Sequence, residues 1–229
     1  LEALKSRLGF PLHRKGRSFL DFYRKAAAVL FVPLLIGSAY WAFHAEHVQQ
    51  EALASIHSPE GARTEFRLPD GTKGWLNSGS VLTYPVGFSD RREVKIEGEA
   101  YFEVVRLNGK PFYVKTDDLT VRVLGTAFNV AAYENDPEIS IILKEGKVEV
   151  CDLESQPDYV MTPDEKFNYD TDKKTAKVSR VDAASQLAWT QGLLQFRGEP
   201  LSEVMKKLSR WYNVDFEIRD RQLRDYNFK

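Results

Sequence analysis

Cysteine and histidine are both scarce in this chain of 229 residues. With a single cysteine, Cys151, no disulfide can form within the chain, and the apolar run around it predicts a small buried strand residue. The four histidines are His13, His44, His47 and His57. None has a cysteine or carboxylate at the spacing of a metal site, so we expect neither a metal nor another cofactor.

The usual sequence signatures of catalysis are missing as well. The chain has no Gly-x-Ser-x-Gly elbow and no glycine-rich run that opens a helix to hold phosphate. No histidine follows His57, which removes most serine and cysteine hydrolase mechanisms. Carboxylates are plentiful, so a glycosidase pair stays open, although scattered acids on strands are usually only solvated. We expect a protein that does not turn over a substrate.

Long apolar runs are rare too, and one occurs, over residues 26–43. It is long enough to cross a hydrocarbon core of about 30 Å as a helix, and aromatic residues flank it on both sides. A cleaved signal peptide is the alternative, because Ala52-Leu53-Ala54 has a small-x-small pattern, but this tripeptide lies well downstream. We expect an uncleaved, single transmembrane helix over residues 26–43.

Charge is distributed unevenly about this run. Residues 1–25 carry seven basic and two acidic groups, whereas the rest of the chain carries 25 basic and 31 acidic groups. Because basic residues stay on the cytoplasmic side, we expect residues 1–25 to form a cytoplasmic tail and the long C-terminal part to lie outside. The mildly acidic outer part does not suggest nucleic-acid binding.

Residues 61–181 carry a β pattern, with short runs of β-branched and aromatic residues between Gly, Asn and Asp turns. Roughly a dozen short strands predict an all-β domain, either a β-roll, a barrel or a sandwich. Gly98 is expected to end one strand, and Asn108-Gly109 predicts a hairpin. Residues 44–60 are polar and lack strong periodicity, so they are expected to be a linker.

The pattern changes at Asp182. A short helix is predicted over residues 182–191 with Asp182 as its N-cap, and Pro200 opens a second helix whose apolar residues recur on one side. Residues 193–196 and 214–218 read as strands on either side of that helix. Residues 182–229 therefore predict the start of a small α+β domain in β-α-β order, and we expect both ends of the sequence to be cut.

Several short blocks follow one another in a fixed order. They are residues 68–72 (LPDGT), 76–80 (LNSGS), 98–104 (GEAYFEV), 111–114 (PFYV), 123–130 (VLGTAFNV) and 145–148 (EGKV), and then Trp189, Phe196, Pro200-Leu201 and Trp211-Tyr212. In this order, behind a membrane span, they resemble the FecR family of transmembrane anti-sigma factors in its Bacteroidetes-type form. The resemblance covers essentially the whole chain.

The resemblance implies a regulator that relays a signal across a bacterial inner membrane. Members of the family hold an extracytoplasmic-function (ECF) sigma factor in the cytoplasm and contact, in the periplasm, the N-terminal signalling domain of a TonB-dependent outer-membrane transducer. Residues 61–181 are then the FecR-like domain, and residues 182–229 resemble the start of a secretin/TonB short N-terminal domain. The cytoplasmic domain of the family is longer than residues 1–25, so no sigma-binding residue is carried over.

Two sets of candidate site residues follow. Some members of the family cleave themselves within the L-G-T block, here between Gly125 and Thr126, by an N-to-O acyl shift that backbone strain at the glycine would favour. An ordinary bend between two strands is the alternative for Gly125-Thr126. The second set is a partner-binding strand edge at Val214, Phe216 and Ile218, because an open edge accepts a partner strand.

Two other functions stay open from the residues alone. A membrane-anchored carbohydrate-binding module would present an exposed aromatic platform, for which the candidates are Trp75, Tyr84, Phe88 and Tyr101, although such residues usually pack into a core. An envelope-assembly protein is the second alternative, since the C-terminal part resembles a secretin module.

Overall fold

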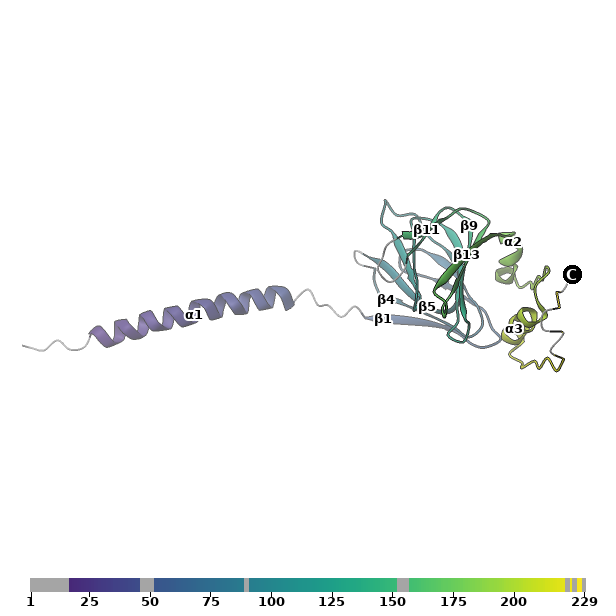
Figure 1. Ribbon diagram of the computed structural model, residues 1–229. Coiled ribbons are helices and arrows are strands. Elements are labelled where there is room, and N and C mark those ends of the chain that lie inside the picture. Colours follow the sequence, from purple (N-terminus) through teal and green to yellow (C-terminus); the bar gives the residue numbers. More distant parts are fainter. Residues whose placement is uncertain are drawn as a thin grey trace, which may run out of the picture. The chain divides into compact units, whose positions relative to one another are not determined.

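The computed structural model describes residues 17–45, 52–88, 91–151, 157–220, 223, 226 and 227 (Figure 1). The chain divides into two compact units, Leu1–Gln50 and Glu51–Lys229. The first unit contains helix α1 (Arg17–Ala45), within which Phe22–Trp41 is apolar and long enough to cross a membrane. Pro33 lies inside this helix, as membrane helices tolerate. The prediction of one N-terminal apolar helix is confirmed.

The second unit is built on one large curled β-sheet, a half-barrel of 13 strands in the described part of the chain. The strands are β1 (Leu53–Ser58), β2 (Thr64–Arg67), β3 (Lys73–Leu76), β4 (Ser80–Pro85), β5 (Arg92–Glu103), β6 (Phe112–Lys115), β7 (Thr120–Val123), β8 (Ala127–Ala132), β9 (Glu138–Glu145), β10 (Val148–Cys151), β11 (Pro157–Met161), β12 (Glu165–Asp170) and β13 (Thr175–Arg180). The main path through the sheet is β11-β10-β7-β6-β5-β8-β9-β12-β13, and β3 and β4 also pair with β5. The predicted all-β domain of many short strands is confirmed.

Strand β5 joins the two halves of the sheet. Its residues 92–97 pair with β4 and β6, and its residues 98–103 pair with β3 and β8. The change of partners falls at Gly98, which has a φ of +103°. The prediction that Gly98 ends a strand is therefore wrong. The glycine bends one continuous strand instead, because a residue without Cβ tolerates that backbone conformation at a sheet corner.

The main hydrophobic core fills the concavity between the two halves of the sheet. Alternate residues along the strands point into it, as the period of a half-exposed strand requires. Phe102, Phe112 and Phe128 are completely buried there, and the rings of Phe102 and Phe128 stack with centroids 5.4 Å apart. Cys151 is buried as predicted.

Two local predictions in this domain are wrong. Residues 53–58, which were expected to belong to the linker over 44–60, form strand β1 and pair with β4 along its whole length. This strand has few apolar residues, since only Ala54 and Ile56 turn partly inward, and so its alternation is hard to recognise. Asn108-Gly109 does form a turn, but not a hairpin, because β6 pairs parallel to β5 after a crossover.

The C-terminal part has helices but no strand ladder among its described residues. It contains the short helix α2 (Ala183–Gln186), the 3-10 helix η2 (Ala188–Gln191) and the helix α3 (Leu201–Tyr212). Asp182 caps α2 as predicted, by accepting a hydrogen bond from the Ser185 amide. The strands predicted over 193–196 and 214–218 are not formed. An isolated bridge joins Pro200 and Asn227, outside both segments. A strand needs a paired neighbour, and the described residues provide none for these segments.

Candidate functional site

Residues 182–212, called the cap here, pack on the outer face of the sheet. A second hydrophobic cluster, separate from the main core, holds the two together. The sheet contributes Tyr101 and Ile142, and the cap contributes Ala183, Leu187 and Trp189. All five side chains are buried, so α2 and η2 form a third layer on the β domain.

Ion pairs attach α3 to the loop between β8 and β9. The carboxylate of Asp136 lies 2.7 Å from Nζ of Lys206 and 2.5 Å from a guanidinium nitrogen of Arg210. The guanidinium of Arg210 also lies over the ring of Tyr133, 3.7 Å from its centroid. Burial raises the pKa of Tyr133, and the nearby Glu99 carboxylate raises it further. These contacts fix the basic side of α3 toward the sheet.

Arg63 makes a second connection between the β domain and the cap. Its guanidinium lies over two indole rings, 4.7 Å from the centroid of Trp211 and 5.9 Å from that of Trp75. It also donates a hydrogen bond to the main-chain carbonyl of Trp189. Because an arginine plane binds aromatic faces well when it is desolvated, this stack joins the β domain to the end of α3.

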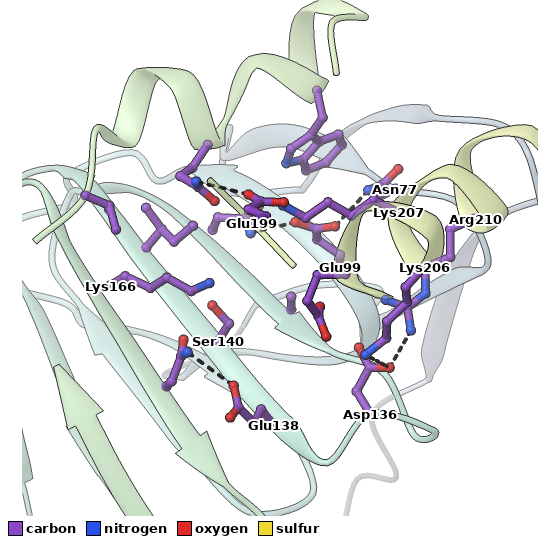
Figure 2. A pocket seen from close by; sticks show the side chains of 18 of the residues that line it. Asn77, Glu99, Asp136, Glu138, Ser140, Lys166, Glu199, Lys206, Lys207 and Arg210 are labelled. Atoms are coloured by element: carbon purple, nitrogen blue, oxygen red, sulfur yellow. Dashed lines mark hydrogen bonds and ion pairs between the residues drawn. The ribbon is translucent and has the colours of Figure 1, made fainter. Parts of the chain in front are cut away.

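A polar cleft of about 590 Å³ lies between the cap and the outer face of the sheet (Figure 2). Its floor comes from β5, β8, β9 and β12, and its walls come from α3, from α2 and from the segment between η2 and α3. Charged groups of both signs line it, as the labelled side chains in Figure 2 show: Glu99, Asp136, Glu138, Lys166, Glu199, Lys206, Lys207 and Arg210. This size is within the usual range of ligand pockets.

Most charges in the cleft are paired within the protein. Both carboxylate oxygens of Glu199 accept hydrogen bonds from Lys207 at 2.8 Å. Glu99 accepts a hydrogen bond of 2.7 Å from the side-chain amide of Asn77 and one of 2.9 Å from that of Asn129. Lys166 differs, because no hydrogen bond or ion pair holds its ammonium group in the described part of the chain. Burial, together with the nearby charge of Lys207, lowers the pKa of Lys166.

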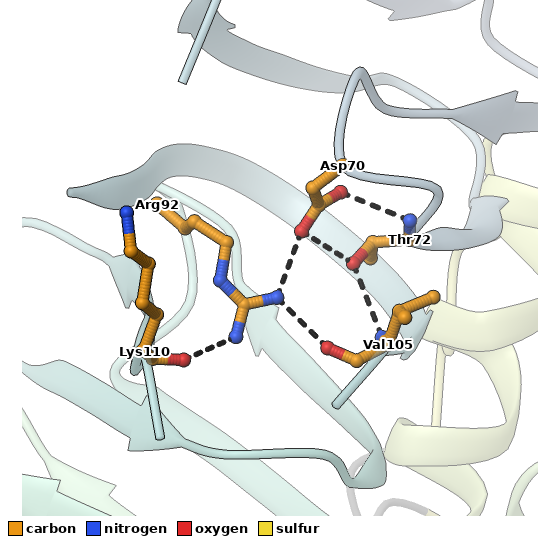
Figure 3. A network of polar contacts seen from close by, with 5 residues as sticks. All are labelled: Asp70, Thr72, Arg92, Val105 and Lys110. Carbon is orange, nitrogen blue, oxygen red and sulfur yellow. Dashed lines mark hydrogen bonds and ion pairs between the residues drawn. The ribbon is translucent and has the colours of Figure 1, made fainter. Parts of the chain in front are cut away.

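A buried ion pair elsewhere supports the fold (Figure 3). Arg92 is 2% exposed, and its guanidinium lies 3.0 Å from the Asp70 carboxylate and donates to the carbonyls of Val105 and Lys110. Asp70 also accepts hydrogen bonds from the amide and the hydroxyl of Thr72. The group connects the turn after β2 with the crossover from β5 to β6. Its position inside the β domain gives it a structural role.

The structure places Gly125-Thr126 in the bend between β7 and β8. A bend between two strands was the alternative to a self-cleavage site here. Thr126 is 5% exposed, and its hydroxyl donates a hydrogen bond of 2.9 Å to the carbonyl of Lys147. Gly125 does not have a positive φ, so the expected backbone strain is not observed there. The glycine is needed for a close approach instead, because an added Cβ would lie 2.7 Å from Cβ of Arg106.

The other predicted sites are distributed over the unit. Val214 and Phe216 are 44% and 46% exposed and Ile218 is half-buried, in an extended segment without strand pairing. The aromatic residues proposed as a platform do not gather on one surface. Trp75 and Tyr101 belong to the cluster under the cap, whereas Tyr84 and Phe88 pack against the main core.

Sequence reasoning missed the cleft. Its floor residues, among them Asn129, Ser140 and Lys166, occupy alternate positions on strands whose intervening residues are in the main core. A signal was available in principle, because a strand residue that faces away from the core is expected to be solvated. Nothing in the chain indicates, however, that a cap beginning almost 40 residues after the end of β9 covers this face.

The candidate membrane helix precedes a separate unit that contains the curled β domain and the cap, an arrangement that suggests a single-pass membrane protein. The family model described as FecR protein matches residues 54–149, and the model described as FecR, C-terminal, matches residues 193–229. The chain belongs to the FecR family of anti-sigma factors. Its role is therefore the regulation of a sigma factor. The resemblance to the FecR family, stated from the ordered sequence blocks, is confirmed.

Two crystal structures of a candidate anti-sigma factor from Parabacteroides distasonis are similar to this chain. One is 41% identical in sequence, with a TM-score of 0.64, over 71% of this chain and 76% of that one. The other is 40% identical, with a TM-score of 0.64, over 70% of this chain and 75% of that one. No curated protein matches the sequence.

Proposed function

We propose that the protein relays the state of a TonB-dependent outer-membrane transducer to an ECF sigma factor. The N-terminus lies in the cytoplasm, α1 spans the bacterial inner membrane, and the β domain with its cap lies in the periplasm. The sigma factor is bound on the cytoplasmic side, and the transducer's N-terminal signalling domain is bound in the periplasm. The observation that carries this proposal is the pair of FecR family matches on the unit that follows the single membrane helix.

The charge distribution supports the orientation. Seven basic groups precede the apolar run, against two acidic ones. Positive charge on the cytoplasmic side of a span is the strongest sequence determinant of its direction. Exposed apolar residues support a periplasmic partner site in the segment after α3, where Val214 and Phe216 are nearly half exposed. Such residues are typical of a surface that a partner covers.

Proteolysis is the proposed means of relay, because a single helix transmits a signal poorly by tilt alone. Its first step is self-cleavage at Gly125-Thr126. The Thr126 hydroxyl oxygen adds to the Gly125 carbonyl carbon and the peptide C–N bond breaks. The hydroxyl proton passes to the threonine nitrogen, which leaves as a free amine. Water then hydrolyses the ester to a carboxylate and the hydroxyl.

Thr126→Ala tests the cleavage step with an internal control. Immunoblots of membrane fractions should show two fragments for the natural chain and an intact Thr126→Ala variant. Thr116→Ala is the matched control, since Thr116 is also buried, at 6%, and also donates its hydroxyl to a main-chain carbonyl. If the natural chain and both variants are equally intact, the relay is conformational and self-cleavage is excluded.

The sigma-regulating function is tested by deleting the gene and measuring sigma-dependent transcription with a reporter. Deletion should change the response to induction, and the ECF sigma factor should co-purify with the intact chain from membranes. An unchanged reporter and no co-purification of any sigma factor would contradict the proposal.

A further inference from the structure

Polar atoms without a hydrogen-bonding partner are concentrated at the cap cleft. Four buried side-chain atoms have no partner among the described residues: Arg92 Nε, Asn129 Oδ1, Asn168 Oδ1 and Trp189 Nε1. Three of the four belong to residues that line this one cleft. Since buried polar groups in folded proteins are nearly always paired, such a concentration indicates a place where a ligand supplies the missing partners.

The two asparagine oxygens are held as acceptors by neighbouring carboxylates. Asn129 donates its amide hydrogen to Glu99 at 2.9 Å, and Asn168 donates to Glu138 at 3.2 Å. Turning either amide over would place its oxygen against a carboxylate oxygen, so the orientation is fixed by charge. Asn129 is 1% exposed and cannot easily rearrange. Both oxygens are therefore available to accept a hydrogen bond from a ligand.

One donor left unused among the described residues, the Lys166 ammonium group, lies on the same face of the sheet as these acceptors. Lys166 is opposite Ile142, which is opposite Asn129, so the three residues form one row across β12, β9 and β8. Asn168 lies two residues along β12 from Lys166 and thus on the same face. Figure 2 shows the Lys166 ammonium group pointing into the cleft. From the strand spacing, Lys166 and Asn129 are about 10 Å apart across the sheet.

The required ligand must both donate and accept hydrogen bonds over a short span. Hydroxyl groups do both, because each has one donor hydrogen and two acceptor lone pairs. The charges of the cleft do not select an ion. Asp136 and Glu199 are paired with bases of α3. Lys166, unpaired within the described part of the chain, shares the cleft with Glu99 and Glu138, whose carboxylates accept hydrogen bonds from neutral asparagine amides. We infer that the cap cleft binds a neutral polyhydroxylated ligand, a saccharide of one or two rings. This site is distinct from the aromatic platform expected of a carbohydrate-binding module.

Occupation of the cleft would affect the cap directly. The floor of the cleft belongs to the sheet and one wall belongs to α3, so a ligand that contacts both stabilises the attached position of α3. The chain would then respond to a small molecule independently of the periplasmic partner proposed above.

The experiment uses the full chain in detergent micelles and isothermal titration calorimetry. The probes are neutral mono- and disaccharides, with glycylglycine as a zwitterion of comparable size. At least one saccharide should bind, and Lys166→Met and Asn168→Ala should each weaken its binding about tenfold or more. Lys147→Met is the matched control, because Lys147 is an exposed lysine of the same unit outside the cleft, and its affinity should be unchanged.

A loss of binding in Lys166→Met can be separated from a loss of folding by measuring the melting temperature. Lys166 loses hydration in the folded state, so methionine at this position should not lower the melting temperature. The inference is overturned if no saccharide binds the folded chain, or if binding is the same in Lys166→Met and Asn168→Ala as in the natural chain. Binding of glycylglycine in place of every saccharide would also overturn it, and would assign the cleft to a zwitterion.

Discussion

The guanidinium of Arg63 lies 4.7 Å from the ring centroid of Trp211, although almost 150 residues separate them in sequence. Arg63 comes just before β2, and Trp211 is in the last turn of α3. The contact makes the position of α3 dependent on the β domain.

Arg63→Lys should loosen the cap while preserving the charge. A lysine has no planar head group to stack on the indoles, so we expect a loss of about 1 kcal/mol in the free energy of unfolding. Hydrogen exchange of the α3 amides should become faster. Arg67→Lys, at an exposed position of β2, is the control and should change neither quantity. Equal exchange in Arg63→Lys and the natural chain would show that the stack does not hold α3.

Gly98→Ala should destabilise the β domain by roughly 3 kcal/mol, since it combines a positive φ with a steric clash. An added Cβ would lie 2.4 Å from the Ser80 hydroxyl oxygen and 2.8 Å from Ser80 Cα, which belongs to the backbone of β4. Gly87→Ala is the matched control, as a Cβ there meets nothing within 4 Å. Urea unfolding measures the stability of both variants. Comparable unfolding midpoints would show that Gly98 is not required for the bend in β5.

Asp70→Ala should cost about 3–5 kcal/mol, because it leaves the buried Arg92 charge without its partner. Glu97→Ala removes one member of an exposed pair with Lys95 and should cost less than about 1 kcal/mol. Thermal unfolding of the two variants compares these effects. A small effect of Asp70→Ala would mean that Arg92 reaches solvent.

Stability should fall at alkaline pH, in part because of Tyr133. The pKa of this buried phenol is raised above its ordinary value of 10.0. As the pH rises past 10.0, the unfolded chain releases the proton while the folded chain keeps it, so the unfolded state is favoured. Tyr101, whose pKa burial also raises, acts in the same direction. Tyr133→Phe should therefore show a shallower loss of stability above pH 10.0, and an identical pH profile would contradict this cause.

The sequence was sufficient for the elements that have a strong period or a specific cap. The apolar run predicted α1, the one-sided apolar stripe predicted α3, and Asp182 predicted the start of α2. It was not sufficient where pairing decides the structure. The segment 214–218 alternates as a strand does, yet it has no neighbour to pair with, and β1 pairs fully although its pattern is weak.

The candidate site could not be predicted for a related reason. Glu99, Asn129 and Lys166 come from three separate strands, and a long-range cap turns this polar face into a cleft. Taken alone, each of these polar residues is predicted to be an ordinary solvent-exposed strand residue. Only the register of β5, β8, β9 and β12 brings the side chains together, and register is a property of the whole sheet.

The most direct test of the account is a binding measurement. The full chain, solubilised from membranes, is presented with the periplasmic signalling domains of the organism's TonB-dependent transducers. We predict selective binding to one of them. Val214→Lys should abolish binding, and Val160→Lys, at a matched exposure of 42% against 44%, should leave it unchanged. No binding of the folded chain to any signalling domain would contradict the proposed relay.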